Sequence, residues 1–136
     1  MSDSSPRRVL VHGVWDLLHV GHIHHLHQAS LLGDELYVSV VPDEFCTKRK
    51  PIHPEKDRLR VIMHLRDVTD AFLCNGPGPE RVIRVLKPHV YVRSTEYLEM
   101  KLPEMTLLEE LGVALAYTRP LPIHTSDIIA RIKALS

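Results

Sequence analysis

Apolar segments alternate with amphipathic segments along almost the whole chain, and this alternation constrains the fold more than any other feature. Five apolar runs have the length and composition of buried strands, at residues 8–13, 35–41, 70–74, 89–93 and 113–117. Segments with helical spacing of apolar residues follow them, at residues 21–32, 54–65, 80–86, 106–111 and 125–135. Strict alternation predicts right-handed βαβ units. We therefore predict an α/β fold of three layers around a five-stranded parallel sheet.

Four positions in the sequence are expected to mark helix ends. Gly33 and Gly112 each follow a helical segment and are expected to cap its C-terminus. Pro54 suits the first turn of the second helix. Thr125 or Ser126 is expected to be the N-cap of the last helix.

The length of 136 residues is that of one ordinary domain. We expect a single domain over residues 8–136 after a disordered tail at residues 1–7, which lacks the apolar stretch of a signal peptide. No apolar run approaches the ~20 residues of a membrane-spanning helix, so a cytoplasmic location is expected. Lys+Arg and Asp+Glu both number 17, which excludes overall attraction to nucleic acid or to an anionic membrane. Cys46 and Cys74 are expected to be free thiols.

The loop after the first strand reads GVWDLLHVGH, and it is the first of three loops that can carry chemistry. Ligands of parallel sheets bind beyond the carboxyl ends of the strands. His19 and His22 flank Gly21 where the first helix begins, and a helix N-terminus offers free N–H groups to a phosphate. Gly21 lets a phosphate approach the backbone, and the two imidazoles can donate to it. Asp16 is expected to orient a histidine or to help hold a metal ion.

Ten histidines stand in the chain, and five of them lie between His19 and His27. The pairs His24 with His27 and His22 with His25 have the i,i+3 spacing of helical metal sites, so zinc binding is an alternative. No carboxylate or cysteine nearby completes such a ligand set. We therefore expect His24, His25 and His27 at the surface or in a substrate pocket.

The loop after the second strand contains the basic run Lys48, Arg49 and Lys50. On a chain with no net charge, this local cluster suits the β and γ phosphates of a nucleotide. A solvated surface loop is the alternative.

The loop after the fifth strand carries Arg119, Thr125 and Ser126. Arg119 is expected to contact a base or a phosphate, and the two hydroxyl residues at a helix start form an anion site. Ordinary helix capping is the alternative, and it is compatible with phosphate binding. The chain contains neither G-x-x-x-x-G-K-[ST] nor G-x-G-x-x-G, which argues against a P-loop enzyme and a dinucleotide dehydrogenase.

Taken in this order and spacing, the three loops resemble the cytidylyltransferase family of the HxGH nucleotidyltransferase superfamily. GVWDLLHVGH is similar to the family signature G-x-F-D-x-x-H-x-G-H, with Trp15 in place of Phe. The lysine loop followed by Arg58 resembles the second family motif, and RPLPIHTSDII resembles R-T-E-G-I-S-T-S-D-I-I. The resemblance covers about residues 9–132, and the compact length is most like the glycerol-3-phosphate cytidylyltransferase type.

The resemblance implies a Rossmann-like fold and transfer of CMP from CTP to a phosphorylated alcohol or sugar, with release of pyrophosphate. Two alternatives stay open. One is an adenylyltransferase of the heptose-phosphate or FMN type that uses ATP, and the other is a non-catalytic nucleotide-binding module. The implied cofactor is Mg²⁺, and dimers are common in the family, so a homodimer is an implied partner state.

The resemblance also assigns roles to individual residues. The catalytic residues are His19, His22, Lys48 and Lys50. The nucleotide-binding residues are Gly13, Val14, Trp15, Asp16, Gly21, Arg93, Arg119, His124, Thr125 and Ser126. The substrate-binding residues are Asp16, Arg58 and His25.

Two loops depart from the family pattern. Residues 120–122 are Pro-Leu-Pro where the family has T-E-G, and His124 replaces its first Ser. Residues 93–96 read RSTE where relatives carry Gly-Asp or Gly-Gly-Asp near the nucleotide base. The sequence therefore leaves the base open between cytosine and adenine.

Overall fold

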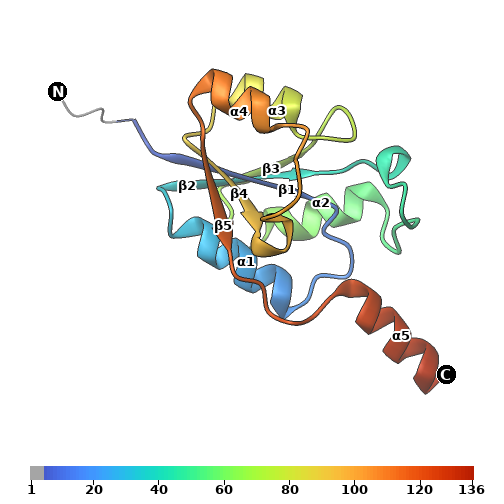
Figure 1. The fold of residues 1–136 in the computed structure, drawn as a ribbon. Helices are drawn as coiled ribbons and strands as arrows, with labels where there is room; N and C mark the ends of the chain where they lie inside the picture. Colours follow the sequence, from blue (N-terminus) through green and yellow to red (C-terminus); the bar gives the residue numbers. More distant parts are fainter. Residues whose placement is uncertain (1–4) are drawn as a thin grey trace.

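The computed structural model describes residues 5–136 and contains a five-stranded sheet in which every pairing is parallel (Figure 1). The strand order is β3-β2-β1-β4-β5. The strands are β1 (Arg8–Gly13), β2 (Glu35–Val40), β3 (Asp70–Leu73), β4 (Val90–Ser94) and β5 (Ala114–Thr118). The chain winds outward from β1 in one direction and then returns to wind in the other. The point of reversal lies between β1 and β4, where parallel sheets bind ligands.

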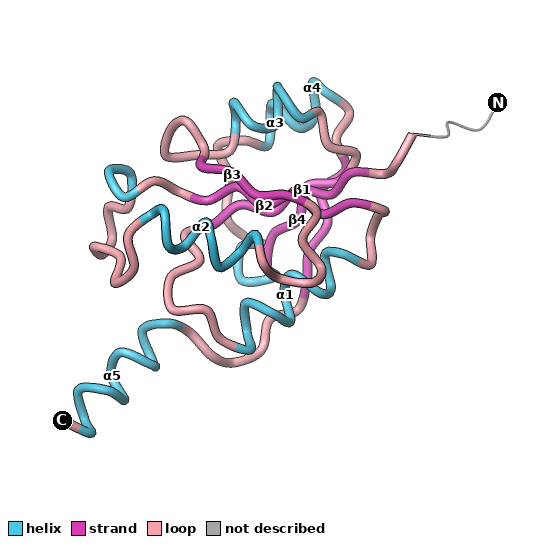
Figure 2. Tube along the Cα trace, turned by 180° about the vertical axis from the view of Figure 1, so that it is seen from behind, coloured by secondary structure: helices cyan, strands magenta, loops and turns pink. Residues whose placement is uncertain are grey.

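Four helices cover the two faces of the sheet, as Figures 1 and 2 show from opposite sides. One face carries α1 (Val20–Ser30) and α2 (Glu55–Met63), and the other carries α3 (Glu80–Leu86) and α4 (Met105–Leu111). Short 3₁₀ turns follow β2 at Asp43–Phe45 and β4 at Thr95–Tyr97. The predicted α/β, Rossmann-like architecture is confirmed, and the five strands begin and end within one residue of the predicted limits.

Alternating side chains of the central strands supply two separate cores. Val9 and Val11 of β1 point toward α1 and α2, where they pack with Leu26 and Ile62. Leu10 points the other way, into the core formed with α3 and α4. Side chains two residues apart therefore share a face. The same alternation decides onto which face of the sheet the polar side chains at the strand ends project.

Three of the predicted helix ends differ in the structure: the C-cap of α1, the N-cap of α2 and, as described in the next paragraph, the N-cap of α5. Helix α1 ends at Ser30 with Leu31 as its cap, so Gly33 does not cap it. A Cβ at Gly33 would lie 2.6 Å from the carbonyl oxygen of Arg7, so close passage of the chain explains this glycine. Pro54 is the N-cap of α2 rather than a residue of its first turn. Gly112 does cap α4, at a φ of 67°.

Helix α5 (Thr125–Leu135) extends away from the sheet in both views, and it contains no buried residue. Its N-cap is His124, so the predicted caps Thr125 and Ser126 are the first two helical residues. The backbone N–H of His124 donates to the Asp127 carboxylate at 3.0 Å, which fixes this helix start.

Residues 1–4 of the predicted tail lie outside the described part of the chain. Arg7 belongs to the folded body, because its backbone N–H donates to Asp34 and its Nε to the carbonyl of Leu32. Within residues 5–136, no helix has the length and apolar character needed to cross a membrane.

Candidate active site

The start of α1 holds His19 and His22 in contact with one another. The N–H of Gly21 donates to Nδ1 of His19 at 3.0 Å, and the N–H of His19 donates to Nδ1 of His22 at 3.2 Å. The two ring centroids are 3.9 Å apart. Because both Nδ1 atoms accept, each neutral ring carries its proton on Nε2. The helix start therefore presents two adjacent Nε2–H donors.

Both of these imidazoles favour the neutral state. Burial, with smaller contributions from His19 and His25, lowers the pKa of His22 to about 4. Burial and the nearby His124 also lower the pKa of His19. At neutral pH the pair consists of neutral donors, and an anion that binds there raises the pKa values of both rings.

Gly21 is required by the protein's own packing. A Cβ at this position would lie 2.8 Å from Cε1 of His19 and 2.8 Å from Cγ2 of Ile123. Ile123 comes from the loop between β5 and α5, so this glycine brings the first and third sequence loops together. The prediction that Gly21 admits a phosphate stays a prediction.

The third loop is tied directly to the first. The hydroxyl of Thr125 donates to the carbonyl oxygen of Asp16 at 3.0 Å. Thr125 and Ser126 open α5, and no hydrogen bond described in residues 5–136 uses their backbone N–H groups. These N–H groups form an unsatisfied helix start beside the start of α1. At the loop after β4, Glu96 lies 3.4 Å from His124 and links that loop to the same helix start.

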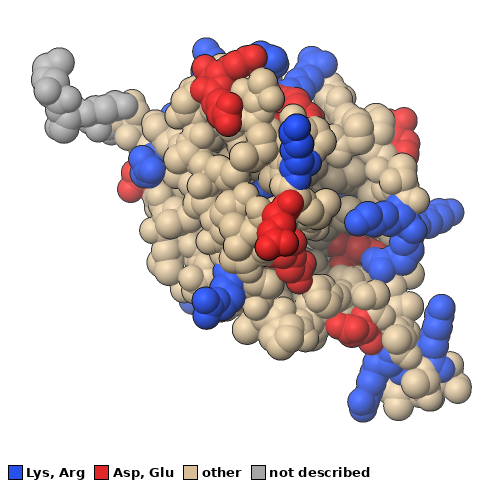
Figure 3. Space-filling model, in the orientation of Figure 1, with Lys and Arg blue, Asp and Glu red and all other residues tan. Residues whose placement is uncertain are grey.

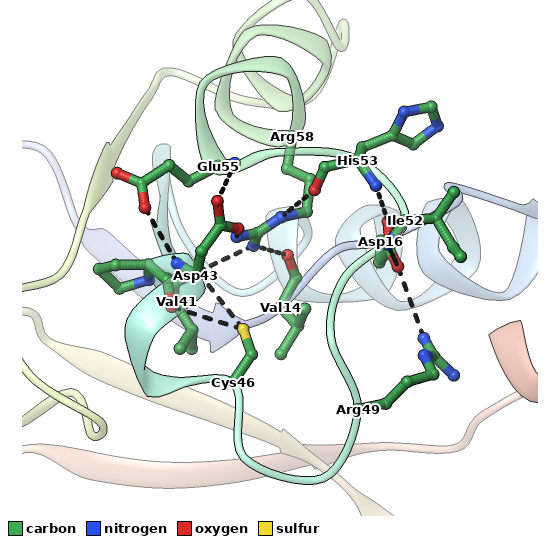
Figure 4. A network of polar contacts seen from close by, with 11 residues as sticks. Val14, Asp16, Val41, Asp43, Cys46, Arg49, Ile52, His53, Glu55 and Arg58 are labelled. Carbon is green, nitrogen blue, oxygen red and sulfur yellow. Dashed lines mark hydrogen bonds and ion pairs between the residues drawn. The ribbon is translucent and has the colours of Figure 1, made fainter.

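Asp16 is buried and anchors the end of the basic loop (Figure 4). Its carboxylate accepts from the N–H of Ile52 at 2.7 Å and of His53 at 3.0 Å. Arg49 lies 3.6 Å from the same carboxylate. These contacts occupy the carboxylate, so it fits a positioning role better than that of a metal ligand.

Arg58 is buried under the same loops (Figure 4). Its guanidinium donates to the carbonyls of Val14, Val41 and His53 at 2.7, 2.8 and 3.0 Å. Its NH2 group also pairs with Asp43 at 2.7 Å, and this bond lowers the pKa of that carboxyl. The expected direct contact of Arg58 with a substrate does not fit this arrangement, because the side chain is enclosed. Arg58 instead holds the loops after β1 and β2 together.

Lys48 and Lys50 are exposed on the loop between the 3₁₀ turn and α2. Figure 3 shows basic side chains gathered at the right-hand edge of the molecule, where Figure 1 places this loop. The anchor at Ile52 keeps the loop near the start of α1. The predicted phosphate contacts of both lysines stay predictions.

The remaining histidines of α1 have partners of their own. His25 Nδ1 bonds to the hydroxyl of Thr118, and His24 Nε2 lies 3.1 Å from the carbonyl of Arg119. His27 pairs with Asp67 at 3.2 Å. Across residues 5–136, no three His, Cys, Asp or Glu side chains converge into a metal site. The helical spacing that suggested zinc therefore has no ligand set in this structure.

Trp15 joins the first loop to β2 and α1. Its Nε1–H donates to the carbonyl of Ser39 at 3.1 Å, and its ring stacks on His25 with centroids 6.0 Å apart. A Cβ at Gly13 would lie 3.0 Å from the Trp15 ring, so the glycine makes room for the indole. Trp15 has a φ of 61°, which is costly for a bulky residue and fixes the turn.

Sequence reasoning named Arg93 but missed the other members of a second polar group, on the face of the sheet that α3 and α4 cover. His12 bonds through Nδ1 to the hydroxyl of Ser39 at 3.0 Å. Arg93 lies over the ring of Tyr97 at 4.2 Å, and its NH1 donates to the hydroxyl of Tyr91 at 3.4 Å. The sequence did contain a signal for this group. His12, Ser39 and Arg93 each lie near the end of an apolar strand, two residues after a residue that packs on the α3 and α4 side.

The structure thus gathers most of the predicted residues at the carboxyl edge of the sheet. Arg119 is the exception, because its side chain is exposed and makes no hydrogen bond described in residues 5–136. Two helix starts, two neutral imidazoles and an exposed basic loop form an arrangement that suits several phosphates in a row.

Comparison with known proteins agrees with this arrangement. The family profile described as Cytidylyltransferase-like matches residues 10–131. The chain is 39% identical to an FAD synthase of Pyrococcus horikoshii over 137 aligned positions, which cover 92% of this chain and 91% of that protein. It is 49% identical over 88 residues to an FAD synthase of Pyrococcus abyssi, covering 61% of this chain and 59% of that protein.

A longer protein and a solved structure are also similar. The chain is 38% identical over 104 residues to the bifunctional protein HldE of Streptomyces coelicolor, covering 74% of this chain and 22% of that protein. A lipopolysaccharide core biosynthesis protein of Thermoplasma volcanium has the same fold, with a TM-score of 0.75 and 29% identity. That match covers 86% of this chain and 99% of the other. Since the family profile spans nearly all of the folded chain and one relative matches it over almost its full length, this chain belongs to the Cytidylyltransferase-like family and is a nucleotidyltransferase.

Proposed function

We propose that this protein transfers AMP from ATP to a phosphate monoester, with FMN as the acceptor, and releases pyrophosphate. The observation that carries the proposal is the pair of helix starts joined by Thr125 and Asp16, with two Nε2–H donors beside them. The choice of ATP and FMN comes from the relatives named FAD synthase. They favour the adenylyl alternative over transfer from CTP, which the signature motifs first suggested.

The reaction needs no protein nucleophile. An oxygen of the acceptor phosphate attacks the α-phosphorus of ATP and forms a new P–O–P linkage. The bond between the α-phosphorus and the bridging oxygen to the β-phosphorus breaks, and pyrophosphate leaves with the electron pair. A phosphate monoester has a second pKa of about 6, so its dianion is already a nucleophile at neutral pH. The protein positions the phosphates and neutralises their charge.

The two imidazoles are assigned to the α-phosphate and to the departing oxygen. His19 and His22 donate from Nε2, where the donors cost no reorganisation once the helix start is formed. The N–H groups of Thr125 and Ser126 hold the triphosphate at the start of α5. Lys48 and Lys50 close over the β and γ phosphates.

A magnesium ion would neutralise charge on the β and γ phosphates, which is the usual contribution of this ion to such reactions. The residues at the edge fit an ion held by phosphate oxygens and water. Asp16 is the nearest predicted carboxylate, and it is committed to two backbone N–H groups. We therefore expect the protein to orient the phosphates rather than to supply a set of ligands to the metal ion.

A phosphorylated sugar is the second candidate acceptor. It is supported by the solved structure of a lipopolysaccharide core biosynthesis protein, which this chain matches over nearly the whole of that protein. The same phosphate-binding groups would serve either acceptor. The choice between them depends on the pocket beyond the acceptor phosphate.

The test is pyrophosphate release measured with Mg²⁺, each of the four ribonucleoside triphosphates, and FMN, sugar phosphates or glycerol 3-phosphate as acceptor. Release that requires ATP and FMN, with FAD identified as the product, supports the proposal. Release that requires CTP would instead support transfer of CMP, the reaction first predicted from the signature motifs. Binding of a triphosphate without release in any combination supports a non-catalytic module. His22→Ala is the control for contaminating activity, since release by a contaminant persists when this residue is removed.

A further inference from the structure

We infer that Arg93 binds the phosphate of the acceptor, on the side of the sheet opposite the triphosphate. This assignment rests on the proposed function and replaces the expected contact of Arg93 with the nucleotide. It is carried by the orientation of the guanidinium, by the donors that the protein leaves unused, and by the face of the sheet from which the side chain projects.

The guanidinium of Arg93 is held in a fixed plane. Its central carbon lies 4.2 Å from the centroid of the Tyr97 ring, a cation–π contact. NH1 donates to the Tyr91 hydroxyl at 3.4 Å, and that hydroxyl donates to Glu104 at 3.0 Å. Glu104 is only 4% exposed, so this support is inside the protein. A side chain held on two sides is prepared for a directional contact.

The other edge of the guanidinium has no protein acceptor. Nε of Arg93 is buried without a hydrogen-bond partner, and NH2 has none among residues 5–136. These two groups share one edge of the planar fork, and that edge matches two oxygens of a phosphate. A buried donor without an acceptor is costly. The protein leaves this edge of the guanidinium unsatisfied, as it also leaves Nε of Arg8.

The positive charge of Arg93 also lacks a direct counterion. No carboxylate in residues 5–136 forms an ion pair with it, and it reaches Glu104 only through the Tyr91 hydroxyl. The neighbouring histidines are neutral, because burial and then the charge of Arg93 lower the pKa of His12 and of His25 to about 4. The local field is therefore positive, and an anion would relieve it.

The face from which Arg93 projects assigns this anion to the acceptor. Tyr91 lies two residues earlier on β4 and packs in the core with α3 and α4, so Arg93 projects on the same face. Helix α1, whose start carries the His19 and His22 donors assigned to the triphosphate, packs on the opposite face. In-line transfer requires the incoming oxygen and the departing pyrophosphate on opposite sides of the α-phosphorus. Arg93 stands on the incoming side.

The experiment compares the wild-type protein with Arg93→Met, Arg93→Lys and the matched control Arg84→Met, which removes an exposed arginine of α3. The KM for FMN is measured at saturating ATP, and the KM for ATP at saturating FMN. We expect Arg93→Met to raise the KM for FMN about 10- to 100-fold, as for loss of charge-assisted hydrogen bonds, and to leave the KM for ATP within about 2-fold. Arg93→Lys keeps the charge but loses the fork, so its effect is intermediate. Arg84→Met matches the wild type.

A binding measurement keeps this inference separate from the proposed function. Phenyl phosphate is titrated by NMR into the protein saturated with α,β-methylene-ATP, which occupies the triphosphate site without being transferred. Phenyl phosphate binding that Arg93→Met abolishes and Arg84→Met preserves supports the role of Arg93, even if no acceptor releases pyrophosphate. Unchanged phenyl phosphate binding in Arg93→Met overturns it. A rise in the KM for ATP with an unchanged KM for FMN also overturns it, and assigns the arginine to the nucleotide.

Discussion

The hydroxyl of Thr125 donates to the carbonyl oxygen of Asp16 at 3.0 Å, across 109 positions of the chain. This bond joins the last helix to the loop after the first strand. Helix α5 has no buried residue of its own, so contacts at its first turn, such as this bond and the 3.4 Å contact of Glu96 with His124, determine where its start lies. The phosphate-binding role proposed for Thr125 would therefore depend on this bond as well as on its backbone N–H.

Thr125→Val removes the hydroxyl and keeps the shape of the side chain. We expect a loss of about 1 kcal/mol in the free energy of unfolding and about 5-fold weaker binding of α,β-methylene-ATP. Ser126→Ala is the control for stability, because the exposed Ser126 hydroxyl makes no bond described in residues 5–136. Urea unfolding and calorimetric titration measure the two effects. Equal stability of the two variants would contradict a structural role for the Thr125 bond.

Arg58→Met is expected to be far more destabilising. It leaves three carbonyl oxygens without this donor and removes one partner of the exposed Asp43 carboxylate. Leaving several such acceptors unsatisfied costs about 1–3 kcal/mol each, so we expect a loss of about 3–5 kcal/mol. Arg60→Met, two residues later and exposed, should change the free energy of unfolding by less than about 0.5 kcal/mol. Urea unfolding of both variants is the measurement, and similar midpoints would show that Arg58 does not hold these loops.

The fold could be predicted closely from the sequence, because alternation of apolar segments is a local signal. The strand limits differ by no more than one residue. Gly33 was misassigned since a glycine after a helical segment is usually a cap, whereas here the nearby Arg7 backbone requires it. The range of α5 was predicted correctly, but its N-cap was placed one or two residues too late because His124 is an unusual N-cap.

The site could be predicted only in part. The position of His19 and His22 followed from the motif, but their Nε2–H tautomers depend on backbone geometry that the sequence does not display. Arg58 was expected at a ligand because the resemblance to the cytidylyltransferase family implies that role. Its actual partners come from the loops after β1 and β2, which only the tertiary structure brings together.

The two lysines of the basic loop are expected to contribute unequally. The Lys50 charge is close enough to Asp43 to help lower the pKa of that carboxyl, so part of its field is already offset. No such neighbour is described for Lys48. Lys48→Ala should weaken binding of α,β-methylene-ATP about 10-fold, and Lys50→Ala about 3-fold, at low ionic strength. Lys56→Ala on α2 is the control. Equal and negligible effects would indicate that this is a solvated surface loop whose lysines do not contact the triphosphate.

His22→Ala is expected to lower kcat by a factor of about 10² to 10⁴, the range for removal of a group that stabilises transition-state charge. Its Nε2–H is one of the two donors at the start of α1, and its Nδ1 also holds the N–H of His19. His27→Ala is the matched control, since His27 lies on the same helix and faces Asp67. A kcat for His22→Ala within a factor of about two of the wild type would exclude the assigned role.

Acid should destabilise the protein well before its carboxylates titrate. The pKa values of His12, His22 and His25 are lowered from 6.5 to about 4, in each case chiefly by burial. Between these pH values the unfolded chain binds protons that the folded chain does not, so the free energy of unfolding falls as pH decreases. The stabilisation is fully present above about pH 6.5 and is lost progressively toward pH 4.

The measurement is the unfolding temperature between pH 7.5 and 4. We expect a fall that begins near pH 6.5, with each kcal/mol lost corresponding to ~3 °C for a chain of this size. His25→Asn removes one of the three groups, so the slope of unfolding temperature against pH should become shallower than in the wild type. His64→Asn, at an exposed histidine after α2, should leave the slope unchanged. A flat profile down to pH 5 in the wild type would mean that these imidazoles are not held neutral by the fold.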